Sequence, residues 1–557
     1  MKKRIVIVGG VAGGATCATR LRRLNEDAEI TIFERGPYVS FANCGLPYYV
    51  GNVIERDSSL LLATPKLFRD RFNIEVRTRN EVTAIHRESC TITVVDLESG
   101  REYTQPYDAL ALSPGAAPIC PPWPGIDLPG VFTLRSVPDS RAIRSWIELT
   151  NPRSAVVVGG GFIGLEMAEN LLHRGLEVTV VELANQVLPP LDPEMAEYAR
   201  QQLLLGGVSV RLGDGVSAFE HNKRGSLTIH TQAGAAINAD LAVVAVGVRP
   251  ETKLAREAGL EIGQRGGIRV GRDLRTSDPR IFAIGDAIEV RNIVTGSYEL
   301  IPLAGPANRQ GRIAADVICG RDSHYDGAQG TAVCGFLNLT VAMTGATEKS
   351  LRRAGNTDFQ CVYLHPGQHV GYYPGAKPIH MKLIFRASDG RVLGAQAIGE
   401  SDVARRIDVI GTAIRMNGSV SDLEELELCY APQFGGAKDP VNLAGMIAGD
   451  VLRRDVDLAP WENLDSPERF VLDVRDPDEH RAGTIPGAIN ISLNELRSRL
   501  HELPHDREIW VTCKVGQRAY YACRILTQHG YRVRNLSGGF STYEVMHPEV
   551  REEAVVS

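Results

Sequence analysis

Residues 5–14 read IVIVGGVAGG, and a helix-like segment to Leu24 and the apolar run ITIFE at 30–34 follow them. Consecutive apolar residues are typical of a buried strand, and a glycine turn lets a pyrophosphate approach a helix N-terminus. Glu34 lies where a carboxylate can bind a ribose hydroxyl. The stretch therefore predicts a βαβ unit that binds a dinucleotide. Val11 replaces the usual middle glycine, so a strand-to-helix turn without ligand is the alternative.

The pattern returns without defect at residues 155–164, which read AVVVGGGFIG, and its second strand ends at Glu182. A glutamate at this point favours the 2′-hydroxyl of NADH and repels the 2′-phosphate of NADPH. Two such units predict an α/β protein with two dinucleotide-binding domains. NADH is the expected nicotinamide cofactor, and NADPH is the less favoured one.

Length and composition limit the other possibilities. A chain of 557 residues predicts about three to four domains. Its net charge of −6, without a basic block, argues against nucleic acid or an anionic membrane as the main partner. No stretch approaches the roughly 18 apolar residues of a membrane span. Ten scattered cysteines without a signal peptide fit a reducing cytoplasm.

Two cysteines stand out by their surroundings. Cys44 lies in SFANCGLPY at 40–48, and Cys513 opens CKVGQR at 513–518. Val39 and Tyr49 occupy the positions where a dithiol reductase would place a second cysteine near Cys44. Any disulfide of Cys44 is therefore expected with a group outside its loop. We expect a nearby helix N-terminus to lower the pKa of this thiol, and a buried structural thiol is the alternative.

Later segments identify the larger family by resemblance. TSDPRIFAIGD at 276–286 resembles the FAD-dependent pyridine nucleotide-disulfide reductases, in which the aspartate, here Asp286, binds the flavin's ribityl chain or phosphate. LALSPGA at 110–116 and AVGVRP at 245–250 resemble that family's crossings between its FAD and NAD domains.

The resemblance implies a domain order. We expect a discontinuous FAD-binding domain at 1–115 and 250–325, an NAD-binding domain at 116–249, an α+β dimerisation domain at 326–450, a linker at 451–463 and an α/β rhodanese domain at 464–557. The dimerisation domain implies a homodimer.

The expected cofactor-binding residues lie in the glycine turns, at the strand ends and in PLAGPAN at 302–308, the segment at the flavin ring. They are Gly9, Gly10, Val11, Ala12, Gly13, Gly14, Glu34, Arg35, Ser113, Pro114, Gly115, Gly159, Gly161, Phe162, Ile163, Gly164, Glu182, Gly247, Gly285, Asp286, Pro302, Leu303 and Ala304. A helix that follows this segment would stabilise charge on a reduced flavin through its N-terminus.

Within that family, SFANCGLPY is most similar to the coenzyme A-disulfide reductases and their persulfide-reducing relatives. The resemblance implies that Cys44 attacks an S–S bond and that coenzyme A is a bound substrate. The residues it assigns to coenzyme A are Thr16, Arg20, Arg23, Ser40, Asn43, Arg71, Asn308 and Lys438. Arg20 and Arg71 are equally compatible with solvated surface arginines.

Two tyrosines complete this resemblance. Tyr372 in YYPG and Tyr430 in YAPQF match segments that place a hydroxyl near the bound sulfur, with Tyr430 expected from the dimer partner. Such a hydroxyl can protonate a departing thiolate. Core packing is the alternative for each.

The C-terminal region resembles a single rhodanese domain. The resemblance is carried by FVLDVR at 470–475, IPGAIN at 485–490, IWVTC at 509–513 and LSGGF at 536–540. A glycine-bearing loop after Cys513 would aim backbone N–H groups at a thiolate or persulfide, and Arg518 would add its charge. Asp473 and Arg475 are expected to be structural.

Two other cysteines are not expected to be reactive or to bind metal. Cys361, His365 and His369 have a metal-like spacing, but the intervening Pro366-Gly367 breaks any helix that would align them, so we expect no metal site. Cys17 lies in the first helix and is expected to pack in the core.

These observations predict an NADH-dependent flavoprotein that reduces coenzyme A persulfide, polysulfide or coenzyme A disulfide, with Cys513 carrying sulfane sulfur from a donor such as thiosulfate. One alternative is an NADH oxidase or peroxidase that cycles Cys44 through sulfenic acid. Those enzymes carry a histidine where this chain has Ala12. The other is a non-catalytic redox sensor or sulfur-relay adaptor.

Overall fold

The computed structural model describes residues 2–222, 225–464 and 469–547. Parts of the expected rhodanese range, 465–468 and 548–557, lie outside the described residues. The chain divides into two compact units, Met1–Asn185 with Leu204–Gly330, and Gln186–Leu203 with Thr331–Ser557.

The first unit begins with a parallel sheet in the strand order β18-β7-β1-β2-β3. These strands are β18 (Ile281–Ala283), β7 (Ala109–Leu112), β1 (Arg4–Val8), β2 (Glu29–Glu34) and β3 (Glu75–Thr78). The helices are α1 (Ala12–Leu24), α2 (Leu46–Val50), α3 (Pro65–Phe72), α7 (Lys253–Glu257) and α8 (Ala304–Ile318). The predicted βαβ unit at 5–34 is confirmed.

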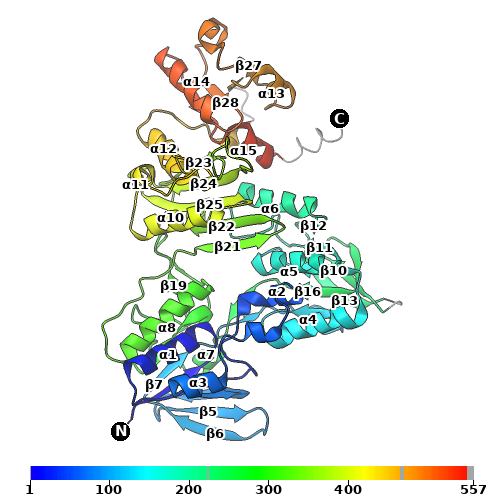
Figure 1. Ribbon diagram of the computed structural model, residues 1–557, viewed down its shortest axis with the longest axis vertical. Coiled ribbons are helices and arrows are strands. Elements are labelled where there is room, and N and C mark those ends of the chain that lie inside the picture. The colour runs from blue at the N-terminus through cyan, green and yellow to red at the C-terminus, as the bar shows by residue number, and fades with distance from the viewer. Residues whose placement is uncertain (1, 223–224, 465–468, 548–557) are drawn as a thin grey trace. The chain divides into compact units, whose positions relative to one another are not determined.

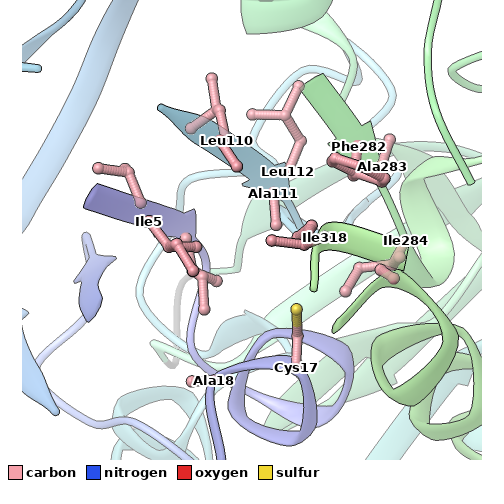
Figure 2. Close-up of a cluster of buried hydrophobic side chains, with 14 of the residues drawn as sticks. Ile5, Cys17, Ala18, Leu110, Ala111, Leu112, Phe282, Ala283, Ile284 and Ile318 are labelled. Carbon is pink, nitrogen blue, oxygen red and sulfur yellow. The ribbon is translucent and has the colours of Figure 1, made fainter. Parts of the chain in front are cut away.

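The core of this sheet is continuous with α1 and α8 (Figure 2). A side chain at Gly311 of α8 would meet the Gly13 carbonyl at 2.3 Å, so the two helices cross with their backbones close together. Cys17 is fully buried, and its sulfur points into the cluster of Ile5, Ala111 and Ile318 (Figure 2). The expected packing role of Cys17 is confirmed.

A second parallel sheet has the order β12-β11-β10-β16-β9. Its strands are β12 (Ser209–Arg211), β11 (Glu177–Val181), β10 (Ser154–Val158), β16 (Leu241–Val244) and β9 (Val131–Thr133), with helices α4 (Val137–Thr150) and α5 (Phe162–His173). Two small antiparallel sheets flank the parallel ones, β4 (Asn80–His86), β5 (Thr91–Asp96) and β6 (Glu102–Pro106), and β13 (Val216–His221), β14 (Leu227–Thr231) and β15 (Ala236–Ala239) (Figure 1). Two more short strands, β19 (Val290–Arg291) and β20 (Tyr298–Glu299), also pair antiparallel.

The chain passes between the two parallel sheets along one short ladder. β8 (Ala116–Pro118) and β17 (Val248–Pro250) pair antiparallel. β17 lies within the segment 245–250, and β8 begins at Ala116, the last residue of the segment 110–116, so the ladder adjoins both segments that resembled the family's crossings.

The second unit contains an antiparallel sheet in the order β21-β22-β25-β24-β23. Its strands are β21 (Ala332–Phe336), β22 (Leu339–Gly345), β25 (Val392–Gly399), β24 (Ile379–Phe385) and β23 (Gln360–Leu364). The helices are α9 (Glu348–Arg353), α10 (Val403–Arg415), α11 (Val420–Glu425) and α12 (Pro440–Leu452), and most of α6 (Pro193–Leu205) belongs to the same unit. The predicted hairpin around Asp389-Gly390 is confirmed by β24 and β25.

The same unit ends in a parallel sheet in the order β27-β26-β28-β29. Its elements are β27 (Ile489–Asn490), β26 (Phe470–Asp473), β28 (Ile509–Thr512) and β29 (Val533–Asn535), with helices α13 (Pro477–Arg481), α14 (Gln517–Gln528) and α15 (Gly539–Met546). The expected linker is not a free tether, because Leu458 pairs with Asn535 and Ala459 is buried in this domain's core.

Among the described residues, none of the helices has both the length and the apolar character needed to cross a bilayer.

Candidate active site and sulfur-carrier loop

The first glycine turn joins β1 to α1. Gly9 has φ +91°, and a side chain there would meet the Ser113 carbonyl at 2.0 Å, so only glycine fits. No side chain caps the N-terminus of α1, and no acidic residue lies in its first turn. Glu34 accepts a hydrogen bond from the Gly10 N–H at 2.9 Å. Free N–H groups beside a fixed carboxylate fit the pyrophosphate and ribose of a dinucleotide.

The second glycine turn has the same construction between β10 and α5. The N-terminus of α5 has no side-chain cap and no acidic first-turn residue, and the space beside Gly161 is open. Glu182 accepts hydrogen bonds from the N–H groups of Gly160, at 2.6 Å, and Ala184, at 2.8 Å. The residues therefore fit a second dinucleotide, with a carboxylate at the ribose position.

A third uncapped N-terminus belongs to α8. This helix begins at Ala304 after Pro302 and Leu303, and its first turn holds no acidic residue. Ala304 and Gly305 are exposed, so the N–H groups of this first turn are open to a ligand. The predicted helix is present, but it begins inside the segment 302–308 and not after it. Its positive end suits an anionic group.

Cys44 lies in the short 3-10 helix Asn43–Gly45 and is exposed, so it is not a buried structural thiol. The preceding loop is bound to the first glycine turn, because the Ser40 N–H donates to the Gly10 carbonyl at 2.9 Å. The Asn43 amide pairs with Arg135, whose guanidinium also bonds to Asp286 at 3.2 Å. Cys44 thus shares a polar cluster with the predicted flavin ligand Asp286.

The pKa of Cys44 corrects one expectation. Burial of the thiol raises its pKa, the negative charges of Glu166 and Asp286 raise it further, and Arg135 opposes them. The lowering expected from a helix N-terminus and the flavin site is absent in the chain without ligands, where burial and these two carboxylates outweigh Arg135. The chain alone therefore holds Cys44 as a thiol.

Glu166 on α5 is a site residue that the sequence analysis missed. It accepts a hydrogen bond from the Tyr48 hydroxyl at 3.3 Å. Burial raises the pKa of Glu166 to about 7, and Glu169 adds to the shift, while Tyr48 opposes it. Its position directly after the second glycine turn was the available signal.

The predicted coenzyme A ligands of the first unit divide into two groups. Thr16 donates to Asn308 at 2.5 Å, which joins α1 to α8 near the exposed start of α8. Arg20 is half-buried in an ion pair with Asp316 at 2.8 Å, so it is not a solvated surface arginine. Arg23 and Arg71 are exposed.

In the second unit, the hydroxyls of Tyr372 and Tyr430 lie 2.9 Å apart. Both residues are exposed, so the core-packing alternative is wrong for both. Their hydrogen bond raises the pKa of Tyr372. Both come from one chain, so one subunit supplies them as a pair. The predicted phosphate ligand Lys438 is exposed in the same unit.

The sulfur-carrier loop, residues 513–518, begins where β28 ends and leads into α14. Cys513 is buried, and its sulfur accepts a hydrogen bond from the Gly516 N–H at 3.2 Å. The N-terminus of α14 has no side-chain cap and no acidic first-turn residue. This arrangement stabilises an anionic sulfur through backbone N–H groups.

The charge of Arg518 is paired with a carboxylate from outside this loop. Its guanidinium donates two hydrogen bonds to Glu479, at 2.6 and 2.7 Å. Asp473 and Arg475 form a buried ion pair at 2.6 Å, which confirms their structural role.

The residues with metal-like spacing contact different partners. Cys361 hydrogen-bonds to Glu348, and His369 to the Tyr373 carbonyl. His365 contacts His380 and Thr542, each at 2.9 Å. Burial lowers the pKa of His365 to about 3, with His380 and Lys514 adding to the shift.

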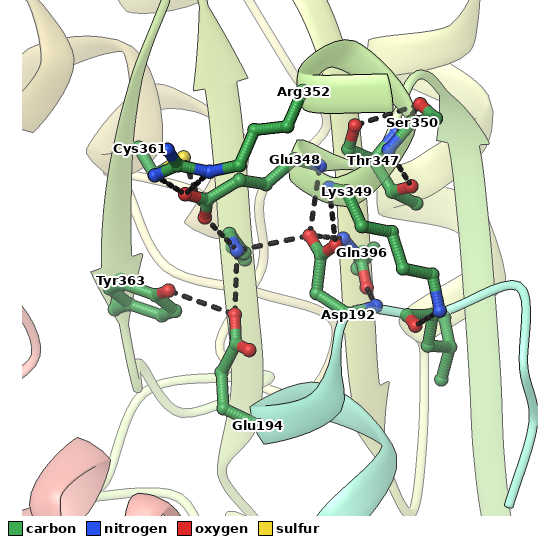
Figure 3. Close-up of polar contacts among 12 residues, drawn as sticks. Asp192, Glu194, Thr347, Glu348, Lys349, Ser350, Arg352, Cys361, Tyr363 and Gln396 are labelled. Atoms are coloured by element: carbon green, nitrogen blue, oxygen red, sulfur yellow. Dashed lines mark hydrogen bonds and ion pairs between the residues drawn. The ribbon is translucent and has the colours of Figure 1, made fainter. Parts of the chain in front are cut away.

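One acidic cluster has the geometry of a metal site, and a lysine occupies it. The carboxylates of Asp192, Glu194 and Glu348 point toward one another (Figure 3). The ammonium group of Lys382, with 0% of its side chain exposed, bonds to all three at 3.0, 2.6 and 2.7 Å. Burial alone would lower the pKa of Lys382, but the surrounding acidic groups, which include Glu194 and Asp192, raise it. The cluster is an ion network.

The comparisons with known proteins agree with this geometry. Residues 3–311 match the pyridine nucleotide-disulphide oxidoreductase family, residues 331–439 its dimerisation domain, and residues 460–545 a rhodanese-like domain. A coenzyme A disulfide reductase of Staphylococcus haemolyticus is 34% identical over 450 residues, which are 81% of this chain and 100% of that protein.

Two solved structures are similar over nearly the whole chain. Reduced CoADR-RHD of Bacillus anthracis is 48% identical, with a TM-score of 0.96 and 99% of both chains covered. An NAD-dependent persulfide reductase from A. fulgidus is 36% identical, with a TM-score of 0.90, covering 97% of this chain and 100% of that one.

Proposed function

This chain belongs to the pyridine nucleotide-disulphide oxidoreductase family, and we propose that it is an NADH-dependent flavoprotein that reduces coenzyme A persulfide, polysulfide and coenzyme A disulfide. The observation that carries the proposal is Cys44, an exposed thiol without a second cysteine in its loop, hydrogen-bonded through its neighbours to the first glycine turn and to Asp286. Similarity to a coenzyme A disulfide reductase and to a persulfide reductase supports this choice of substrates.

The two dinucleotide sites have different roles in the proposal. The family implies FAD and a nicotinamide dinucleotide. FAD would be held by the turn of Gly9 to Gly14, by Glu34 and by Asp286, and the nicotinamide dinucleotide by the turn of Gly159 to Gly164. Glu182 favours NADH, because its carboxylate would repel a 2′-phosphate.

The chemistry at Cys44 begins with attack on an S–S bond. The Cys44 thiolate attacks the sulfane sulfur of coenzyme A persulfide, its Sγ–S bond forms, and the bond to coenzyme A breaks. With coenzyme A disulfide, the same attack leaves a mixed disulfide and one coenzyme A thiolate. When bound, FAD would supply two electrons from NADH, which regenerate the Cys44 thiol and release sulfide from its persulfide or the second coenzyme A from the mixed disulfide.

The polar groups around Cys44 control its protonation. The negative charge of Glu166 disfavours the thiolate, whereas Arg135 favours it. Since the pKa of Glu166 is about 7, its protonation near neutral pH removes one of the two opposing charges.

We assign the Tyr372–Tyr430 pair to the leaving thiolate, which one hydroxyl protonates while the other holds it in place. The dimerisation domain supports a homodimer in which the partner subunit supplies this pair. Thr16, Ser40, Asn43 and Lys438, among others, would bind coenzyme A. The sulfur-carrier loop would receive sulfane sulfur on Cys513 and pass it to coenzyme A.

Anaerobic NADH consumption tests the proposal, with coenzyme A persulfide and coenzyme A disulfide as separate substrates and sulfide release as a second readout. We expect Cys44→Ser to abolish turnover of both. Cys120→Ser is the matched control, since Cys120 is also an exposed cysteine of the first unit. Flavin reduction by NADH that only oxygen or peroxide reverses would instead support an oxidase.

A further inference from the structure

Both cations of the sulfur-carrier loop are already paired with carboxylates from outside it. Arg518 binds both oxygens of Glu479 on α13, and Lys514 binds Glu544 on α15 at 2.9 Å. Asp476 adds a third carboxylate, 3.9 Å from Arg518. The side chains of Arg518 and Glu479 are 31% and 35% exposed, so the pair is shielded from bulk water only in part.

The neighbouring basic side chains are bonded to a carboxylate as well. Arg475 and His480 both bind the buried carboxylate of Asp473, on the strand next to β28. Among the described residues, the backbone adds a positive contribution that no carboxylate pairs with, through the Gly516 N–H that bonds to the Cys513 sulfur and the uncapped N-terminus of α14. Backbone N–H groups suit a singly charged sulfur, and they leave a doubly charged donor without a counter-charge.

We infer that Glu479 and Glu544 determine the donor of the carrier loop, which takes sulfane sulfur from an organic persulfide, R–S–SH, in preference to thiosulfate. The inference rests on the proposed function of Cys513 as a sulfur carrier. Thiosulfate brings two negative charges toward two carboxylates, whereas the sulfur of a persulfide brings at most one.

The transfer balances without an oxidant or reductant. The Cys513 thiolate attacks the outer sulfur of R–S–SH, the Sγ–S bond forms, and the S–S bond of the donor breaks. The thiolate R–S⁻ leaves, and the proton stays on the transferred sulfur, so Cys513 ends as a persulfide.

The test is sulfurtransferase activity of the full-length holoenzyme to cyanide, with thiosulfate and glutathione persulfide as donors. We expect Glu479→Gln to raise kcat/KM for thiosulfate about tenfold at low ionic strength, because the Arg518 charge is freed. Glutamine still accepts the hydrogen bond that Glu479 takes from Asp476, so α13 stays capped. The gain should shrink in about 0.5 M salt, and kcat/KM for glutathione persulfide should change less than about threefold.

Two further variants identify the cause. Adding Arg518→Gln to Glu479→Gln should abolish the gain, while Glu502→Gln, which alters an exposed ion pair of the same domain, should leave both donors unchanged. Thiosulfate turnover that stays the same or falls in Glu479→Gln overturns the inference. Loss of both transfers in Cys513→Ser supports the carrier role independently, and retained transfer in that variant refutes the carrier role itself.

Discussion

Replacing Lys382 by methionine should destabilise the second unit strongly. The substitution keeps most of the side-chain volume but leaves Asp192, Glu194 and Glu348 without the cation that bonds to each of them within 3.0 Å. Removing one partner from a buried ion pair costs about 3–5 kcal/mol of unfolding free energy. For a domain of about 150–250 residues, this corresponds to a fall in Tm of roughly 6–20 °C.

The pH dependence of this loss gives a sharper test. In the wild type, burial raises the pKa of Asp192 and Glu348, but Lys382 outweighs burial and the pKa of both carboxyls is lowered. Their contribution to the free energy of unfolding is therefore complete above the unfolded pKa and is lost only as the pH falls through the folded pKa. In Lys382→Met, Asp192 loses this cation, so its burial raises its pKa above the unfolded value, while Glu348 keeps its ion pair with Arg352. The variant should therefore regain stability as the pH falls from 8 toward 5. The difference in free energy of unfolding between the variant and the wild type should become smaller over this range.

The assay is denaturant unfolding at several pH values, with hydrogen exchange of peptides from β23 to β25 to localise the effect. Lys377→Met is the matched control, because the ion pair of Lys377 with Glu400 is half exposed and is worth less than about 1 kcal/mol. The reasoning would be refuted if Lys382→Met lowered the free energy of unfolding by less than about 1 kcal/mol, or if the difference from the wild type grew as the pH fell.

Three other substitutions probe the site and its surroundings. Glu166→Gln should lower the pKa of Cys44, seen as a downward shift in the pH midpoint of its alkylation rate, and an unchanged midpoint would contradict the charge effect. Glu182→Ala should raise kcat/KM for NADPH relative to NADH by about tenfold or more, since a carboxylate that repels the 2′-phosphate is removed. An unaltered ratio of the two kcat/KM values would argue against a position of Glu182 beside the ribose 2′-hydroxyl. His365 stays neutral in the folded protein down to about pH 3, while the unfolded chain takes up a proton on this residue near pH 6.5. The free energy of unfolding therefore decreases as the pH is lowered from about 6.5 to about 3. His365→Gln should flatten that part of the Tm profile, and an equally steep profile would show that other groups cause it.

Much of the fold could be predicted from local sequence. The βαβ units at 5–34 and 155–182 were recognisable because strand, glycine turn and helix are consecutive and their geometry is short-range. The hairpin at Asp389-Gly390 was predictable for the same reason, because its turn residues and both strands are consecutive in the sequence. A helix near residues 302–308 was also expected, although it begins at Ala304, earlier than predicted.

The partners of the reactive groups were not predictable in this way. Arg135 and Asp286 are 151 positions apart, and Lys382 and Glu194 are 188 apart, so no local pattern connects them. Glu479 lies 39 positions before Arg518 and was invisible as its counter-ion. Each of these pairs forms only when separate elements pack together.

The sequence by itself determined where the two proposed reactive cysteines lie, which turns fit dinucleotides and which families the chain resembles, because these properties reside in short runs of residues. Only the tertiary structure decided the charge that each sulfur experiences. Cys44 has a raised pKa since packing brings Glu166 and Asp286 to it, and the carrier loop loses its net positive charge since α13 and α15 present carboxylates to Arg518 and Lys514. Electrostatic fields depend on distance and burial, and both are set by packing rather than by order along the chain.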